Sequence, residues 1–249
     1  MLVRQRVAEI MDDPLLDEGL HRAALKGLEH LNAIGNSKMI VAAKIEKLAR
    51  TFAVTGHNQP LKVLDLACGA GDQAIALSKY FASKNLPVEI HGLDISGTAV
   101  AYAEASYQNC VQSCGPGIGK CTFSQLDVID DQLPNGFDVI ITSLFTHHLD
   151  PAQIITLLAK MAARARHIIM VNDLERSLTN LWGVTLATRL VTTSAVVHHD
   201  GPASVRAAFT AAEMLQMARD AGLHNASVSR QFPCRILLTA EGKEKNVAV

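Results

Sequence analysis

From residue 61 onward, short apolar runs alternate with stretches of helical periodicity, and this alternation constrains the fold more than any other feature. The apolar runs are rich in Val, Ile and Leu and show little polar alternation, which is typical of strands covered on both faces. Such strands alternating with helices predict βαβ units with right-handed connections and a parallel sheet. We expect strands over residues 61–66, 87–94, 121–127, 137–145 and 167–173, and helices over 72–84, 97–112 and 151–163.

The first 55 residues contain no convincing strand, and we expect a helical cap over residues 1–55. Residues 13–35 and 37–53 have helical spacing of their apolar side chains. The first of these helices carries Leu20, Ala24, Leu28 and Leu31 on one face, with Gly35 as its C-terminal cap. The cap precedes one larger domain over residues 56–249.

The C-terminal part opens with a helix and ends in two strands. Thr210 and Glu213 have the spacing of a capping box, which predicts a helix start. Residues 225–242 then predict two strands joined tightly around Phe232 and Pro233. About 35 residues between Asp173 and Thr210 exceed what a plain doubly wound fold needs.

The composition narrows the partners and the compartment. A formal net charge of −1 gives no basic field for a polyanion, so we expect no nucleic-acid partner. The N-terminal sequence lacks the apolar region of a signal peptide, and no run is long enough for a membrane span. Five scattered cysteines are expected to be buried, reduced thiols without a metal, and we expect the protein to be cytoplasmic.

The stretch VLDLACGAGD, residues 63–72, predicts a nucleotide-binding turn between the first strand and its helix. Within it, GAGDQA matches G-x-G-x-x-A, whose glycines let a ligand approach the backbone closely. Two carboxylates, Asp65 and Asp72, flank the turn, and the nearest lysine, Lys79, lies about two helical turns away. Each carboxylate facing a pyrophosphate would cost on the order of 1 kcal/mol. The charges therefore favour a cationic ligand.

These residues resemble motif I of the class I S-adenosylmethionine (SAM)-dependent methyltransferases, with Ala67 where the first glycine often stands. The resemblance covers roughly residues 60–240 and includes the acidic ends of the next two strands. It implies an α/β, Rossmann-like, doubly wound sheet of seven strands, mostly parallel with an antiparallel last strand. It further implies SAM as the cofactor and S-adenosylhomocysteine as the product.

The resemblance implies a set of cofactor contacts at the strand ends. Asp94 lies 23 residues after Gly71, where a carboxylate binds the ribose hydroxyls, and Asp127 matches the acidic contact to adenine. Without the resemblance, Asp94 could simply cap a helix and Asp127 could be a turn residue. The implied contacts are Asp65, Ala67, Gly69, Gly71, Asp94, Ile95, Asp127, Val128, Ser143 and Leu144.

The arrangement is similar to methyltransferases of the ubiquinone and menaquinone type and of aromatic or polyketide tailoring. This implies O- or C-methylation of a small, largely apolar acceptor such as a phenol, quinol or polyketide. Histidine titrates near neutrality, so at most one of His147, His148, His198 and His199 is a candidate base. We expect no catalytic metal: Asn172 and Asp173 could be ligands, but Thr142 and Ser143 replace the acid that metal-dependent catechol methyltransferases need.

An insertion over residues 174–208 follows the fifth strand, where small-molecule methyltransferases commonly carry a lid over the acceptor. Together with the N-terminal helices it is expected to form the substrate pocket, with Trp182 and Arg206 as lining residues. An apolar stripe runs along this insertion, and we expect most of it to pack in the core; its members are Leu181, Trp182, Leu186 and Leu190. Gly201 and Pro202 predict a hinge or turn.

Two other classes of protein remain open. Tyr80 and Lys84 have the Tyr-x-x-x-Lys spacing of short-chain NAD(P)-dependent reductases, but they directly follow the glycine turn, whereas those enzymes carry the pair at least two strands later. A SAM-binding protein without turnover is the second alternative. Neither the acceptor nor the oligomeric state follows from the sequence.

Overall fold

The computed structural model describes residues 3–12, 15–17, 19–20, 23–24, 27, 39–56, 59–114 and 117–243, and its centre is a seven-stranded sheet. The strand order is β3-β2-β1-β4-β5-β7-β6. Strands β1 to β5 pair in parallel, whereas β7 is antiparallel to both β5 and β6. The strands are β1 (Leu61–Leu66), β2 (Val88–Asp94), β3 (Cys121–Gln125), β4 (Phe137–Ser143), β5 (Ala165–Leu174), β6 (Ser227–Gln231) and β7 (Arg235–Glu241). The expected mostly parallel sheet with an antiparallel last strand is confirmed.

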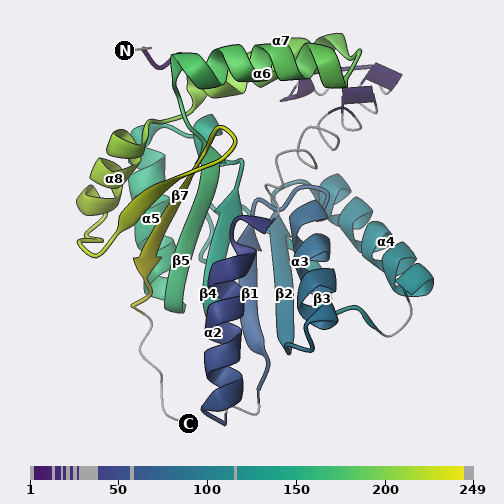
Figure 1. Ribbon diagram of the computed structural model, residues 1–249, viewed down its shortest axis with the longest axis vertical. Helices are drawn as coiled ribbons and strands as arrows, with labels where there is room; N and C mark the ends of the chain where they lie inside the picture. Colours follow the sequence, from purple (N-terminus) through teal and green to yellow (C-terminus); the bar gives the residue numbers. More distant parts are fainter. Residues whose placement is uncertain are drawn as a thin grey trace.

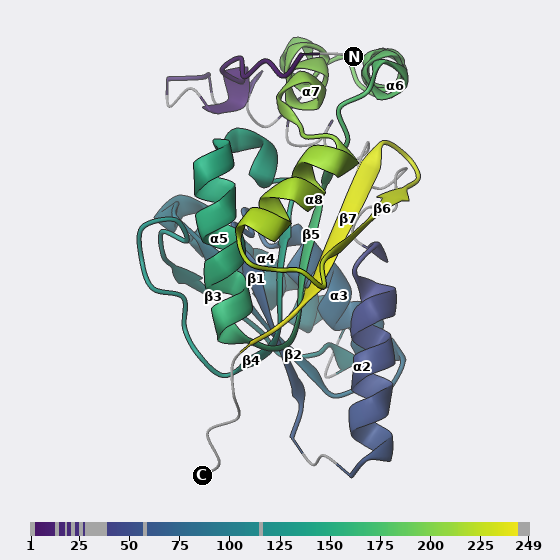
Figure 2. The ribbon, with the colours of Figure 1, turned by 90° about the vertical axis from the view of Figure 1, so that its left-hand side faces the viewer.

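Helices cover both faces of the sheet and the carboxyl ends of its parallel strands (Figures 1 and 2). One face carries α2 (Ala42–Val54), α3 (Asp72–Ser83) and α4 (Gly97–Cys114), and the other carries α5 (Pro151–Arg164) and α8 (Ala211–Asp220). Above the carboxyl ends of the parallel strands lie α6 (Leu178–Val191) and α7 (Ala195–Ala207). Two short 3₁₀ helices complete the described part, η1 (Ile10–Asp12) and η4 (Thr146–His148).

Alternation along the central strands sends side chains into two separate cores. In β1, Leu64 and Leu66 face α5 and α8, whereas Leu61 and Val63 face the opposite helices. Both sets are buried. Burial on both faces explains why the strand sequences are almost continuously apolar.

The capping signals read from the sequence set the helix starts. At α8, Thr210 accepts from the backbone of Glu213 while the Glu213 side chain accepts from the backbone of Thr210. The same reciprocal bonds join Asp150 and Gln153 at the start of α5, where Pro151 occupies the first turn. The capping box at Thr210 is therefore confirmed.

The expected turn at Gly201 and Pro202 is wrong, because α7 runs through both residues. The reason lies in the packing between α6 and α7. A Cβ on Gly201 would stand 2.8 Å from Thr188 Cγ2, so the absence of a side chain lets α7 lie directly against α6. Both residues are part of the continuous helix α7, which packs closely on α6.

Part of the expected N-terminal cap is outside the described residues. Leu28, Leu31 and Gly35 fall in that part, and the described portion of the cap contains α2 and a few helical residues before it. Ala24 is one of these, and it is buried against Val196 and Val197 of α7. No helix in the described part of the chain is long and apolar enough to cross a membrane.

Gly71 fixes how closely α3 approaches its neighbours, so we predict that Gly71→Ala destabilises the fold. A Cβ there would stand 2.7 Å from the Phe123 ring and 2.8 Å from Ala103, and the backbone φ of +77° is left-handed. Overpacking and backbone strain together should lower the free energy of unfolding by about 2–4 kcal/mol. Urea denaturation followed by circular dichroism measures this change.

Gly117→Ala is the matched control, because a Cβ at Gly117 meets no atom within 4 Å. Its free energy of unfolding should change by no more than about 0.5 kcal/mol. Equal losses in the two variants would contradict the packing role of Gly71.

Candidate active site

The turn after β1 has an unusual backbone that leaves one side open. Ala67, Gly69 and Gly71 have φ angles of 53°, 53° and 77°. A Cβ on Gly69 would have no atom within 4 Å, so a ligand can approach its backbone. Ala67 holds the same left-handed conformation at a cost of roughly 1–2 kcal/mol for a residue with a side chain.

Asp65 is a buried carboxyl with an unused oxygen. Its side chain lies at the carboxyl end of β1, is 2% exposed, and its Oδ2 has no hydrogen-bond partner among the described residues. Burial, with a smaller effect of Asp94, raises the pKa of Asp65 to about 7. A cationic group placed beside this oxygen would stabilise its charged form.

A second buried polar atom on the same turn also has no partner. Gln73 lies in the first turn of α3, and its Nε2 makes no hydrogen bond to the described residues. The glycine turn is therefore flanked by an unused acceptor on Asp65 and an unused donor on Gln73. Sequence reasoning missed Gln73, because an amide next to a glycine turn carries no signal of its own.

Asp94 joins the end of β2 to the glycine turn. Its Oδ2 accepts from the Gly69 amide at 2.7 Å and its Oδ1 accepts from the Ser96 amide at 2.9 Å. The carboxylate is partly exposed and Ile95 beside it is exposed. Asp94 therefore holds the turn in place while its side chain stays partly exposed.

The remaining implied cofactor contacts lie at the ends of β3 and β4. Asp127 Oδ1 accepts from the Ile129 amide at 2.8 Å, so this carboxylate shapes its own turn, and the Val128 side chain packs in the core. Ser143 ends β4, and Leu144 follows it with a φ of 55°. All four strand ends face the same edge of the sheet, and the cofactor role of these residues stays a prediction.

His147 and Asp173 form a buried pair at the same edge. His147 lies in η4 after β4, Asp173 lies near the end of β5, and His147 Nδ1 is 2.7 Å from Asp173 Oδ1. Asp173 Oδ2 accepts from Thr146 Oγ1 at 2.5 Å and from the His147 amide at 3.0 Å. These bonds fix both the loop and the ring.

Their charges follow from this geometry. Burial alone lowers the pKa of His147, but the Asp173 carboxylate, helped by Glu9, outweighs burial and raises it. Burial alone raises the pKa of Asp173, but the His147 ring and the Thr146 hydroxyl hold it well below its usual range. Asp173 is therefore ionised and orients the imidazole.

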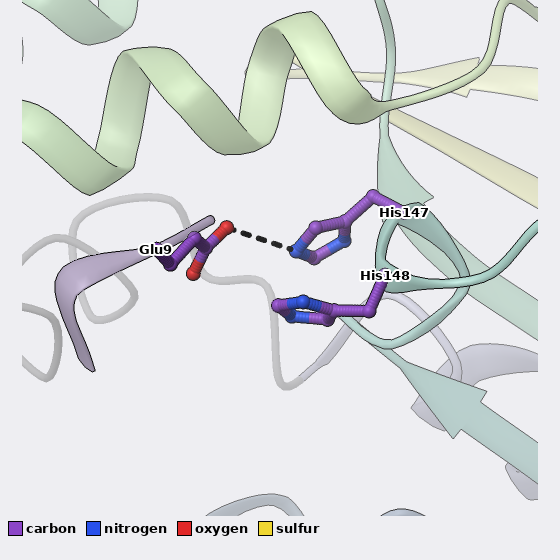
Figure 3. Close-up of side chains that lie close together, drawn as sticks. All are labelled: Glu9, His147 and His148. Carbon is purple, nitrogen blue, oxygen red and sulfur yellow. Dashed lines mark ion pairs between the residues drawn. The ribbon is translucent and has the colours of Figure 1, made fainter. Parts of the chain in front are cut away.

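His148 and Glu9 complete a cluster around His147 (Figure 3). The two imidazole rings lie side by side with centroids 4.2 Å apart, and both point toward Glu9. Glu9 Oε1 is 3.9 Å from His147 Nε2. The structure thus gathers His147 and His148 with one carboxylate that sequence reasoning did not single out.

Glu9 belongs to an N-terminal strap, residues 3–12, that crosses over the loop after β4. Arg4 anchors the start of the strap by donating to the carbonyls of Ala207 at 2.6 Å, Leu149 at 2.8 Å and His147 at 3.1 Å. Its guanidinium also lies 4.0 Å above the Phe209 ring. The strap is therefore attached to the end of α7 and to the His147 loop at once.

Asp200 of α7 anchors the other end of the strap. This buried carboxylate accepts from the amides of Ile10 at 2.8 Å and Met11 at 3.0 Å. It also bonds to His199 Nδ1 at 2.9 Å. The partners lie about 190 residues apart in the chain, and no local pattern could have revealed them.

The other predicted residues lie on α6 and α7. His198 Nε2 bonds to the Thr192 carbonyl at 2.8 Å, and the Arg206 carbonyl accepts from the Gln5 amide. The expected burial of the apolar stripe on α6 is wrong, since Trp182 is 75% exposed and Leu186 and Leu190 are also exposed. The reason is that α6 is an outer layer whose inner side faces α7. The roles of Trp182, Arg206, His198 and His199 stay predictions.

Comparison with known proteins finds a similarity over the central part of the chain. Residues 63–167 match the family described as "Methyltransferase domain", which includes the glycine turn and the His147 loop. No curated protein sequence matches the chain. This stretch of the chain is therefore similar to a methyltransferase domain.

Solved structures with the same fold include several methyltransferases. Magnesium protoporphyrin IX methyltransferase from Synechocystis PCC 6803 is 17% identical, with a TM-score of 0.53 over 94% of this chain and 91% of that one. The plantazolicin methyltransferase BpumL is 15% identical, with a TM-score of 0.62 over 91% and 92%. SibL, an S-adenosylmethionine-dependent methyltransferase, is 16% identical, with a TM-score of 0.64 over 92% of this chain and 60% of that one.

We predict that Asp200→Ala loosens the strap. The substitution leaves the Ile10 and Met11 amides without their acceptor, and losing two such bonds should cost about 1–3 kcal/mol. Hydrogen exchange at these two amides should then be at least about tenfold faster, because 1.4 kcal/mol corresponds to a factor of ten.

The control is Asp130→Ala, which removes an exposed carboxylate from the loop after β3. It should leave exchange at Ile10 and Met11 unchanged. Unchanged exchange in Asp200→Ala would show that the strap is held by other contacts.

Proposed function

We propose that this protein transfers a methyl group from SAM to a small, largely apolar acceptor, by O- or C-methylation. The observation that carries the proposal is the buried Asp65 carboxyl, whose Oδ2 has no partner beside an open glycine turn. A buried, unpartnered carboxyl favours a positively charged ligand, and SAM carries both an ammonium and a sulfonium. The similarity of residues 63–167 to a methyltransferase domain supports the same conclusion.

The residues around the turn fit this cofactor. Asp65 Oδ2 would accept from the ammonium group, the open backbone at Gly69 would take the carboxylate end, and Asp94 would bind the ribose hydroxyls. Gln73 Nε2, a buried donor without a partner among the described residues, would donate to the carboxylate of SAM. When bound, SAM supplies a methyl group on a positively charged sulfur, which is already activated for displacement. The protein has to align the acceptor with that methyl group and exclude water.

A nicotinamide cofactor fits the same turn less well. Its pyrophosphate would lie at the start of α3, where Asp72 is in the first turn and Asp65 lies behind it. Placing two carboxylates beside a pyrophosphate is unfavourable by on the order of 1 kcal/mol each. The reductase alternative therefore has the charges against it, and a SAM-binding protein without turnover is distinguished only by an assay.

The acceptor is activated at Nε2 of His147. Asp173 occupies Nδ1, so Nε2 is the ring atom that points toward Glu9 of the strap. A fixed imidazole is a common device for activating a hydroxyl, and activation by one positioned group contributes typically 10²–10⁴-fold in rate. Of the four candidate histidines, we therefore propose His147, in the loop after β4, as the one that activates the acceptor.

The acceptor class is proposed from the surroundings of this loop. The strap, α6 and α7 lie over the carboxyl ends of the parallel strands, where small-molecule methyltransferases commonly carry a lid, and this supports a phenol, quinol or polyketide over a nucleic acid. The structural neighbours are named for very different acceptors, a porphyrin in one case and plantazolicin in another. We therefore do not propose either acceptor for this chain. We further propose a cytoplasmic location and no nucleic-acid partner, on the basis of composition and charge.

Calorimetric titration tests the cofactor assignment directly. SAM should bind, and NADH under the same conditions should give no heat. Because Asp65 has a pKa of about 7, raising the pH from 6 to 7.5 ionises it and should strengthen SAM binding. The increase is roughly eightfold at most if only the ionised carboxyl binds.

Asp65→Asn is the matched variant for this titration, since it keeps the size of the side chain and cannot ionise. Its SAM affinity should not change between pH 6 and 7.5. A flat profile in the unsubstituted protein would refute the Asp65 contact, and heat from NADH alone would refute the cofactor assignment.

His147→Asn tests acceptor activation. Asparagine can still donate to Asp173 but has no atom in place of Nε2. Methyl transfer from labelled SAM to a panel of phenols and quinols should fall about 10²–10⁴-fold. The SAM affinity should stay within about twofold, because the loop remains bonded to Asp173.

His224→Ala removes an exposed histidine between α8 and β6 and serves as the control. It should transfer methyl groups at the unsubstituted rate. A His147→Asn variant that keeps full activity would place acceptor activation elsewhere.

A further inference from the structure

The cluster of Glu9, His147 and His148 has the chemistry of a metal site. One ligand atom from each residue lies within 4.8 Å of the other two. The donors come from the strap and from η4, so they converge only in the folded chain (Figure 3). Two imidazoles and one carboxylate are the donor set that proteins use for divalent first-row transition metals.

We propose that Glu9, His147 and His148 bind one divalent transition-metal ion, such as Zn²⁺, which holds the oxygen of the methyl acceptor. The role in methyl transfer rests on the proposed function, whereas the binding of the ion does not. This departs from the expectation of a metal-free site, which considered the cysteines and the ligand positions of catechol methyltransferases.

The distances allow an ion between the strap and the loop. His147 Nε2 and Glu9 Oε1 are 3.9 Å apart, which is too long for a hydrogen bond. Zinc bonds of roughly 2.0–2.1 Å to nitrogen and 2.0–2.2 Å to oxygen would together span this gap. A tetrahedral site needs donors roughly 3.4 Å apart, so a small movement of the long Glu9 side chain would complete it.

The surroundings of the three donors are those of a supported metal site. Asp173 accepts from Nδ1 of His147 at 2.7 Å, so Nε2 is the nitrogen directed at the ion. A carboxylate behind a histidine ligand fixes its ring and raises its basicity. On the other side, the Ser204 hydroxyl donates to Glu9 Oε1 and orients that carboxylate.

The donor types also select the class of ion. Magnesium and calcium prefer oxygen ligands throughout, and two nitrogens out of three disfavour both. Three protein donors leave at least one position for an outside oxygen, as in catalytic zinc sites. The ion would also link the strap to the loop after β4, since the ligands come from both.

With the ion bound, Nε2 of His147 is a ligand, so it activates the acceptor through the ion and does not take the proton itself. The acceptor hydroxyl binds at the open position and loses its proton to water more readily, because a bound cation stabilises the oxyanion. The oxygen then forms its bond to the methyl carbon as the carbon–sulfur bond breaks. The electron pair of that bond stays on sulfur, which becomes neutral.

Titration of the chelator-treated full chain with Co²⁺ and Zn²⁺ tests the proposal. One equivalent of either ion should bind, and Co²⁺ should give visible absorption bands of a nitrogen-containing site. Glu9→Gln and His148→Ala should each weaken binding by about tenfold or more, as expected when a ligand or its support is lost. His224→Ala and Glu104→Gln, at exposed sites elsewhere, should leave binding unchanged.

Two measurements separate a lost ligand from a disturbed fold. Hydrogen exchange at the Ile10 and Met11 amides should show the strap in place in Glu9→Gln, and SAM titration should show an unchanged cofactor site. Absence of saturable binding, or binding that Glu9→Gln leaves intact, would overturn the metal site. Failure of SAM to bind would instead overturn the proposed function and leave the metal result standing.

Discussion

Parallel pairing of β1, β2, β4 and β5 is the constraint on which the site depends, because it brings the carboxyl ends of these strands to one edge. The glycine turn, Asp94 and the His147 loop each follow a different strand and still become neighbours there. The pairing of Ser143 with Asn172 sets the register that places Asp173 beside η4. Without it, Asp173 would be an isolated carboxylate in a strand.

Two buried carboxyls at this edge have opposite surroundings, and the contrast divides the site into two parts. Burial raises the pKa of Asp65, and one of its oxygens has no partner among the described residues, so a cation from outside the chain would stabilise its charged form. Asp173 is bonded on both oxygens by Thr146, His147 and a backbone amide, so it stays charged. Asp65 can therefore bind a ligand, whereas Asp173 positions the His147 ring.

The sheet and the glycine turn were predictable because their signals are local. Strand periodicity, the capping box at Thr210 and the acidic turn around Asp65 can each be read within about ten residues. The strap could not be predicted in this way, because Arg4, Glu9 and Asp200 bond across about 190 residues or more and show no spacing that announces it. Gly201 and Pro202 predicted a turn wrongly for a similar reason: α7 runs through both residues and packs closely against α6, and the local sequence does not reveal this contact.

The strap has a consequence for the order in which the molecule is completed. Its residues are synthesised before their partners at Leu149, Ser204 and Ala207, which follow up to about 200 residues later. The sheet up to β4 is available long before α7 exists to receive the strap. Attachment of the strap is therefore a late event during biosynthesis, and a nascent chain stalled before α7 would carry the glycine turn and the histidine pair without the strap bound over them.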